Sequence, residues 1–128
     1  MNQSTILLVE DNQALRLIYK NQLLHDGYLV LESSTVKEAQ DQLQNHQIDL
    51  LLLDIMLPDK SGLTFLEDLR KESRFLQVPV IMLTSLPDEI AFDKGKTLGI
   101  HGYLVKDQVT PAQVSQRVKL ALIESQKT

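Results

Sequence analysis

The feature that most constrains the fold is an apolar run that ends in a charge. Residues 48–58 are IDLLLLDIMLP, with four consecutive leucines before Asp54 and a proline at position 58. A continuous apolar run of this length, closed by a proline, is typical of a strand that is buried on both faces of a parallel sheet. The last side chain of such a strand lies at the rim of the sheet. Asp54 is therefore expected where a carboxylate can meet solvent or a ligand.

Four other short apolar runs predict further strands, and helical spacing follows each of them. The runs cover residues 5–9, 28–32, 80–84 and 102–105. Glycines at positions 27 and 99 are typical helix ends, and Thr110 followed by Pro111 is a typical helix start. Strands that alternate with helices predict one α/β domain of five βα units. Its parallel sheet would be covered on both faces by right-handed crossovers.

The composition limits the classes of function. The chain has 128 residues, which suits one domain of common size. Its formal net charge of -4 argues against direct contact with nucleic acid, since phosphate contacts need a basic face. It has no cysteine for a disulfide or a thiolate metal site, and no apolar stretch near the ~20 residues of a membrane span. A cytoplasmic protein without membrane or nucleic-acid contact is expected.

Polar residues stop the predicted strands. Five of them follow or end the strands near the switch point in strand order: Glu10, Asp11, Asp54, Thr84 and Lys106. Ligands of such sheets bind beyond the carboxyl ends of the strands, so these side chains are expected at one rim. Three carboxylates this close repel one another unless a cation is present, and an all-oxygen set suits Mg²⁺, with Mn²⁺ as the alternative. A metal, a lysine and a hydroxyl around a carboxylate are what phosphoryl transfer to an aspartate requires.

Four motifs carry a resemblance to a known family. They are LLVEDN at 7–12, LLLDIMLPDKSG at 51–62, VIMLTS at 80–85 and GYLVK at 102–106. With these motifs in this order, the chain resembles the receiver domains of two-component response regulators over essentially its whole length. The resemblance implies a CheY-like, flavodoxin-like (βα)5 fold with strand order 2-1-3-4-5.

The same resemblance implies the extent of the domain. Residues 3–124 would form the receiver domain, and residues 125–128 would form a frayed tail with no output domain.

The resemblance also implies a role for the acidic residues. Asp54 would be the phosphoacceptor and would receive its phosphoryl group from a histidine kinase or a histidine phosphotransfer protein. Glu10 and Asp11 would hold Mg²⁺ together with Asp54, and the backbone carbonyl of Met56 would complete the coordination. The chain would be a phosphorylation-activated signalling switch that catalyses only its own phosphorylation and dephosphorylation, and not an enzyme in the ordinary sense.

The family resemblance further implies how the switch works. Thr84 and Lys106 would contact the phosphoryl group, and Tyr103 would turn inward when Thr84 moves. The face formed by the fourth helix, fifth strand and fifth helix would then change. An unidentified downstream protein would read it, or a second copy of the chain would bind there. The mechanism would be a population shift between two pre-existing states.

The chain departs from the family pattern near two of the motifs. Asp107 follows Lys106, where the family usually has a proline, often after a cis bond. A cis bond at a non-proline residue costs roughly 2.5–4 kcal/mol, so a trans bond with a shifted loop, or local strain, is expected. The Asp107 carboxylate could also compete for Lys106. Ser85 stands where the family often has alanine and is still small, while Met56 and Leu86 flank the route of hydrolytic water. Slow autodephosphorylation is the resulting hypothesis.

Other functions compete with this one. A phosphohydrolase of the haloacid dehalogenase type carries a second aspartate two residues after the nucleophile, where this chain has Met56. A flavodoxin-like cofactor carrier needs Ser, Thr and Gly after the first strand, where this chain has EDNQ at residues 10–13. A receiver-like scaffold that is never phosphorylated stays open. So does a receiver fragment of a larger kinase or transcription factor, as opposed to a stand-alone protein.

Several other residues are expected to be structural only. His25, His46 and His101 show no ligand spacing and are expected at the surface. The charged residues between positions 67 and 72 are expected on a solvated helix face, and the side chains of Met56 and Met82 are expected in the core.

Overall fold

The computed structural model describes residues 3–85 and 87–126 of the chain. Strands and helices alternate along it. The strands are β1 (Thr5–Val9), β2 (Leu29–Ser33), β3 (Leu50–Asp54), β4 (Val80–Thr84) and β5 (Gly102–Val105). The helices are α1 (Gln13–His25), α2 (Val36–Asn45), α3 (Gly62–Arg70), α4 (Glu89–Thr97) and α5 (Pro111–Ser125), with short 3₁₀ turns at Ser73–Phe75 and Lys106–Gln108.

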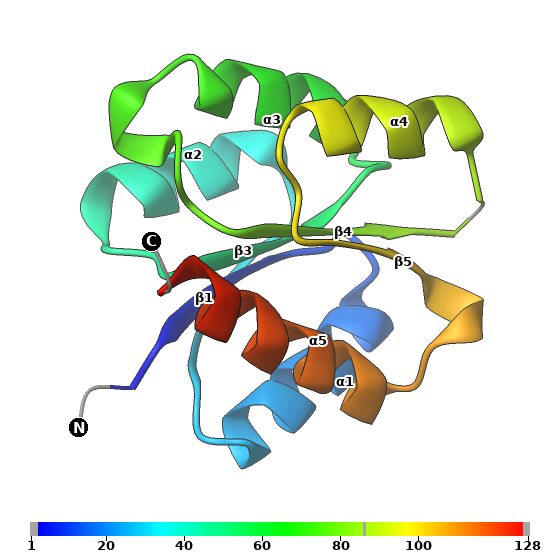
Figure 1. Ribbon diagram of the computed structural model, residues 1–128. Helices are drawn as coiled ribbons and strands as arrows, with labels where there is room; N and C mark the ends of the chain where they lie inside the picture. Colours follow the sequence, from blue (N-terminus) through cyan, green and yellow to red (C-terminus); the bar gives the residue numbers. More distant parts are fainter. Residues whose placement is uncertain (1–2, 86, 127–128) are drawn as a thin grey trace.

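The five strands form one parallel sheet in the order β2-β1-β3-β4-β5. Helices α2, α3 and α4 cover one face, and α1 and α5 cover the other (Figure 1). This arrangement confirms the predicted α/β fold and its strand order. It places β1 and β3 side by side at the point where the strand order reverses, which is where ligands of such sheets bind.

The central strand β3 divides the core into two parts. Leu51 and Leu53 pack into the cluster beneath α2 and α3, while Leu50 and Leu52 pack into the cluster beneath α1 and α5. All four side chains are fully buried. Burying a leucine stabilises a fold by about 1.5–3 kcal/mol, so the strand that carries Asp54 is anchored on both faces.

Side chains cap helices α1, α2 and α5, and the start of α5 at Thr110 is where the sequence predicts it. The side chain of Asn12 accepts the Leu15 N–H and caps α1. Thr35 caps α2, and Thr110 starts α5 with a reciprocal capping box. Helix α5 ends at Ser125, within the tail that was expected to fray. Residues 127–128 of that tail lie outside the described part of the chain.

The peptide bond between Lys106 and Asp107 is trans, which is one of the two alternatives that the sequence left open. No peptide bond in the described residues is cis. The chain instead enters the short 3₁₀ turn Lys106–Gln108, in which Asp107 is exposed. The Lys106 ammonium pairs with Glu10 and Asp54, and not with the exposed Asp107.

Arg70 is not on a solvated face, which corrects the sequence interpretation. Its guanidinium is partly buried and donates to backbone carbonyls on two separate loops. The acceptors are Leu98, Phe75, Leu76, Val78 and Gly99. Carbonyls that leave a helix or enter a strand lack regular partners, and a long planar donor at the end of α3 can satisfy several of them.

Two other surface and core expectations were partly wrong. His25 and His46 are exposed as expected, but His101 is half-buried, and burial lowers its pKa. Met82 is fully buried, whereas the side chain of Met56 is 62% exposed. Met56 follows the end of β3, where the chain has already left the sheet.

Candidate functional site

The parallel register brings the predicted polar residues to one rim of the sheet. Val9 of β1 pairs with Leu53 of β3, so the residues that follow them, Glu10 and Asp54, lie level with each other. On the other side, Thr84 of β4 pairs with Val105 of β5, just before Lys106.

Three acidic side chains meet at this rim. Glu10, Asp11 and Asp54 each place a carboxylate oxygen within 4.8 Å of the others. Glu10 is 0% exposed and Asp54 is 2% exposed, while Asp11 faces solvent. Like charges at this separation disfavour one another, and the low polarity around the two buried groups strengthens that effect.

Lys106 lies between the two buried carboxylates. Its Nζ is 2.6 Å from Oε1 of Glu10 and 3.0 Å from Oδ2 of Asp54. Burial alone would lower the pKa of Lys106, but its bonds to the two carboxylates outweigh burial and raise it. The pKa of Glu10 is raised, chiefly by burial, although the bonds from Lys106 and the Asn12 N–H act against this rise.

The donor set fits a divalent cation. Three carboxylates and one ammonium leave negative charge in excess at the rim. All the acidic donors are oxygens, and one of them is open to solvent, which suits a hard ion that keeps some of its water ligands. Glu10, Asp11 and Asp54 are therefore a candidate metal centre.

Backbone N–H groups orient both buried carboxylates. The Asn12 N–H donates to Oε2 of Glu10 at 3.1 Å, and the Met56 N–H donates to Oδ1 of Asp54 at 3.0 Å. In each case the donor is two residues further along the chain, as in the turns that aspartate side chains form with their own backbone. Each carboxylate thus has one oxygen held by the backbone and the other held by Lys106.

The loop after β3 folds back against Asp54. The Gly62 N–H donates to the carbonyl of Ile55 at 2.7 Å. A Cβ at position 62 would lie 2.2 Å from the backbone carbonyl oxygen of Asp54, so this approach requires glycine. The close contact ties the start of α3 to the strand end that carries the candidate phosphoacceptor.

Asp59 holds the same loop from its other side, and the sequence analysis missed it. Its two carboxylate oxygens accept the N–H groups of Val36 and Lys37, at 3.0 Å and 3.1 Å, at the start of α2. These bonds, the one from Val36 foremost, lower the pKa of Asp59. A carboxylate at a helix N-terminus is a common arrangement, but nothing local in PDKSG says which helix it will reach.

An open cavity of about 450 Å³ lies over the acidic cluster. Besides the acidic residues and Lys106, its walls include residues of the β1–α1 loop, the first turn of α1, the β3–α3 loop and the position after β4: Asn12, Leu15, Met56, Leu57, Pro58 and Ser85. Met56 and Ser85, two of the residues expected to tune the site, therefore line it. Leu86, the third, lies outside the described residues.

The two predicted switch residues lie on the neighbouring strands β4 and β5, two register positions apart. Thr84 is buried at the end of β4, next to Ser85. Tyr103 packs edge-on against Phe92 of α4, with ring centroids 5.4 Å apart, and its hydroxyl donates to the carbonyl of Asp88 at 3.3 Å. Tyr103 thus contacts the start of α4 and is not a wall of the acidic cavity.

Comparison with known proteins agrees with this geometry. The family described as response regulator receiver domain matches residues 6–119. The chain belongs to this family. Its members are signalling switches of two-component systems and not classical enzymes. The receiver fold and its acidic pocket are therefore family features of this chain.

Individual receiver proteins are similar over nearly the whole chain. Regulatory protein VanR of Enterococcus faecium is 35% identical over 117 residues, which cover 91% of this chain and 49% of that protein. The transcriptional regulatory protein PhoP of Bacillus subtilis, named for alkaline phosphatase synthesis, is 34% identical over 94% of this chain and 49% of its own length. The chain spans about half the length of the curated relatives that it matches.

A solved structure shows the same fold. The CheY-like response regulator receiver domain protein from Methanospirillum hungatei JF-1 aligns with a TM-score of 0.90 and 28% identity, over 98% of each chain. Among the described residues, no helix is long and apolar enough to cross a membrane.

Proposed function

We propose that this receiver is a phosphorylation-activated switch that accepts a phosphoryl group on Asp54 in a Mg²⁺-dependent reaction. The donor would be a histidine kinase or a histidine phosphotransfer protein, and the exchange would take place in the cytoplasm. One observation carries the proposal. Asp54 lies in an open cavity, within reach of two more carboxylates, and forms an ion pair with Lys106, whose side chain is 9% exposed.

The residues would divide the chemistry among them. A carboxylate oxygen of Asp54 attacks the phosphorus of the donor phosphohistidine; the new O–P bond forms as the N–P bond breaks, and the imidazole leaves. Glu10, Asp11, Asp54 and the Met56 carbonyl would hold Mg²⁺, which when bound neutralises charge on the transferring group. Lys106 would exchange its bond to Asp54 for one to a phosphoryl oxygen.

The output would run through β4 and β5. The Thr84 hydroxyl would move toward the phosphoryl group, and Tyr103 would leave Phe92 and the Asp88 carbonyl to turn inward. Phosphorylation adds a charge of about -2, which would shift the population between two pre-existing states. A downstream protein, or a second copy of the chain, would read the face formed by α4, β5 and α5. On that face Ile90 is 80% exposed and Phe92 is 39% exposed, which supports a protein contact.

The lifetime of the phosphorylated state would depend on the cavity walls. Met56 and Ser85 line the cavity, and the exposed Met56 side chain would restrict the access of water to it. We propose slow autodephosphorylation on this ground, with residues 3–124 as the receiver unit. The lifetime in Met56→Asn would be shorter than in wild type; equal lifetimes would remove Met56 from this role.

Incubation with acetyl phosphate tests the metal dependence. With Mg²⁺, the intact mass of the wild-type chain should rise by one phosphoryl group, and Asp54→Asn should show no gain. With EDTA in place of Mg²⁺, the wild-type gain should disappear. No gain under any condition would favour the scaffold that is never phosphorylated. An equal gain with EDTA would remove the metal from the proposal.

A further inference from the structure

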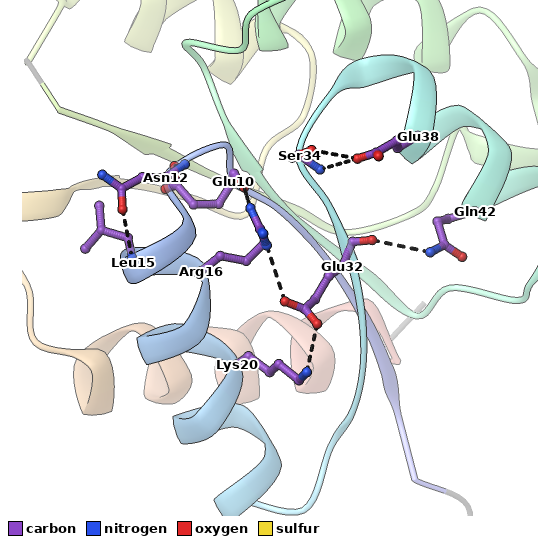
Figure 2. A network of polar contacts seen from close by, with 9 residues as sticks. All are labelled: Glu10, Asn12, Leu15, Arg16, Lys20, Glu32, Ser34, Glu38 and Gln42. Atoms are coloured by element: carbon purple, nitrogen blue, oxygen red, sulfur yellow. Dashed lines mark hydrogen bonds and ion pairs between the residues drawn. The ribbon is translucent and has the colours of Figure 1, made fainter.

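A second polar network joins Glu10 of the acidic cluster to α1 and β2 (Figure 2). Its central residue is Arg16 of α1, whose side chain is 18% exposed. Arg16 Nη1 donates to the backbone carbonyl of Glu10 at 2.7 Å, and Nε donates to Oε1 of Glu32 at 3.3 Å. One guanidinium therefore connects the β1–α1 loop with the edge strand β2.

The carbonyl that Arg16 holds belongs to the peptide between the two acidic neighbours. The Glu10 N–H donates to the Ser33 carbonyl at 3.0 Å, so the backbone of Glu10 is fixed on both sides. A peptide unit is planar, and the orientation of the Glu10 carbonyl therefore sets the direction in which Asp11 leaves the strand. The Asp11 side chain is exposed. The bond from Arg16 to the Glu10 carbonyl therefore helps to fix the direction of Asp11 through the backbone.

Arg16 is itself held in place by Glu32. The second carboxylate oxygen of Glu32 pairs with Lys20 at 2.8 Å, and its backbone carbonyl accepts from Gln42 of α2 at 3.3 Å. The pKa of Glu32 is lowered, chiefly by its bond with Lys20, so it is an anion at neutral pH. The planar fork of arginine can serve two acceptors at once, which a lysine ammonium on a flexible chain cannot do in the same geometry.

We propose that Arg16 is a positioning residue for the metal centre: by holding the peptide between Glu10 and Asp11, it sets the placement of their carboxylates for Mg²⁺. The inference rests on the Mg²⁺ binding in the proposed function. Arg16 bonds to the backbone carbonyl of Glu10 and not to the carboxylates that would bind Mg²⁺. It would therefore act on the metal centre through the backbone.

The sign of the effect separates positioning from simple charge. Arg16 is a cation beside a site for a cation, and by Coulomb's law its removal alone would strengthen Mg²⁺ binding. Loss of the backbone hold would weaken it instead. Lys20 offers a matched control, because it carries the same charge and pairs with the same Glu32, whereas the Glu10 carbonyl is bonded by Arg16.

The test is a Mg²⁺ titration followed by the backbone amide signals of Asn12 and Met56 in ¹H–¹⁵N NMR. Arg16→Met should weaken Mg²⁺ binding about 10-fold, as the loss of a residue that supports metal ligands does. Lys20→Met should bind Mg²⁺ as tightly as wild type or more tightly. Equal or tighter binding by a folded Arg16→Met chain would overturn the inference, as would a similar loss of affinity in Lys20→Met.

Two further outcomes are distinguishable. Absence of Mg²⁺ binding by the wild-type chain would contradict the proposed function itself and not only the role of Arg16. If Arg16→Met does not fold, the Mg²⁺ affinity of Arg16→Lys is the test, because lysine keeps the positive charge but lacks the planar guanidinium. Binding about threefold weaker or more in Arg16→Lys would support positioning, and wild-type affinity would overturn it.

Discussion

The ammonium nitrogen of Lys106 lies 3.0 Å from Oδ2 of Asp54, across 52 positions of sequence. The same nitrogen is 2.6 Å from Glu10, so one cation joins two buried carboxylates. Removing one partner of a buried ion pair leaves the other charges without compensation, which is costly for carboxylates as buried as those of Glu10 and Asp54. Lys106 is thus central to the stability of the site as well as to its proposed chemistry.

Replacing Lys106 should expose this double role. Lys106→Met should lower the free energy of unfolding at neutral pH by about 3–5 kcal/mol, because Glu10 and Asp54 lose their shared cation. Mg²⁺ should then raise the melting temperature of the variant more than that of wild type, since it would supply the missing positive charge. Thermal denaturation with and without Mg²⁺ checks both statements. An unchanged stability without metal would show that the ammonium does not stabilise the pair.

Gly62 should be far less tolerant of a methyl group than Gly95. Gly62→Ala would place Cβ 2.2 Å from the Asp54 carbonyl, a backbone atom, and should cost about 1–3 kcal/mol as well as slow phosphorylation of Asp54. Gly95→Ala is the matched control. Its Cβ would meet the flexible end of the Ile100 side chain at 2.7 Å, and alanine favours the helix by about 1 kcal/mol. Chemical denaturation compares the two, and equal losses would contradict the role of the close approach.

The Asp59 carboxylate should make stability depend on pH in the acid range. Its pKa in the folded chain is lowered from the ordinary 3.8 by the N–H groups of α2, so its contribution is present above that pH and is lost as pH falls through the folded value. The stability difference between wild type and Asp59→Ala should therefore shrink below about pH 4. The difference in stability between Asp59→Asn and Asp59→Ala should not change with pH, since neither asparagine nor alanine at position 59 titrates. If the difference in stability between wild type and Asp59→Ala did not change with pH, this prediction would be wrong.

Arg70 should matter more to stability than its neighbour Arg74. Arg70→Met would leave three part-buried carbonyls without this donor, at a cost of about 1–3 kcal/mol. Arg74 is exposed, donates to one part-buried carbonyl, that of Leu43 at 3.3 Å, and lies over the Phe75 ring with its guanidinium carbon 4.7 Å from the ring centroid. Such a contact contributes about 0.5–1 kcal/mol, so Arg74→Met should cost less. Urea unfolding of both variants checks the order, and a reversed order would contradict it.

The fold could be predicted because its signals are local. The runs at residues 80–84 and 102–105 became β4 and β5 with the same bounds. The strand-end residues Glu10, Asp54 and Lys106 met as predicted, since a parallel sheet aligns its carboxyl ends whatever the details of the loops.

What the sequence could not predict are contacts between segments that are distant in the chain. Arg70 and Asp59 are charged residues of the kind usually found at the surface. Their partners are backbone groups, which nearly every residue carries, so the sequence does not show which ones they contact. The location of Tyr103 depends on how α4 packs beside β5, and the patterns of the two elements do not contain that information. The roles of Thr84 and Tyr103 in switching remain predictions.

The identity of the phosphoacceptor is the central claim, and its most direct test uses two aspartates of the same loop region. Asp54 is buried in the cavity wall, whereas Asp59 is exposed and bonded to α2. After incubation with acetyl phosphate and Mg²⁺, the intact mass of wild type and Asp59→Asn should rise by one phosphoryl group, while that of Asp54→Asn should not change. A phosphoryl group retained in Asp54→Asn, or lost only in Asp59→Asn, would contradict the account.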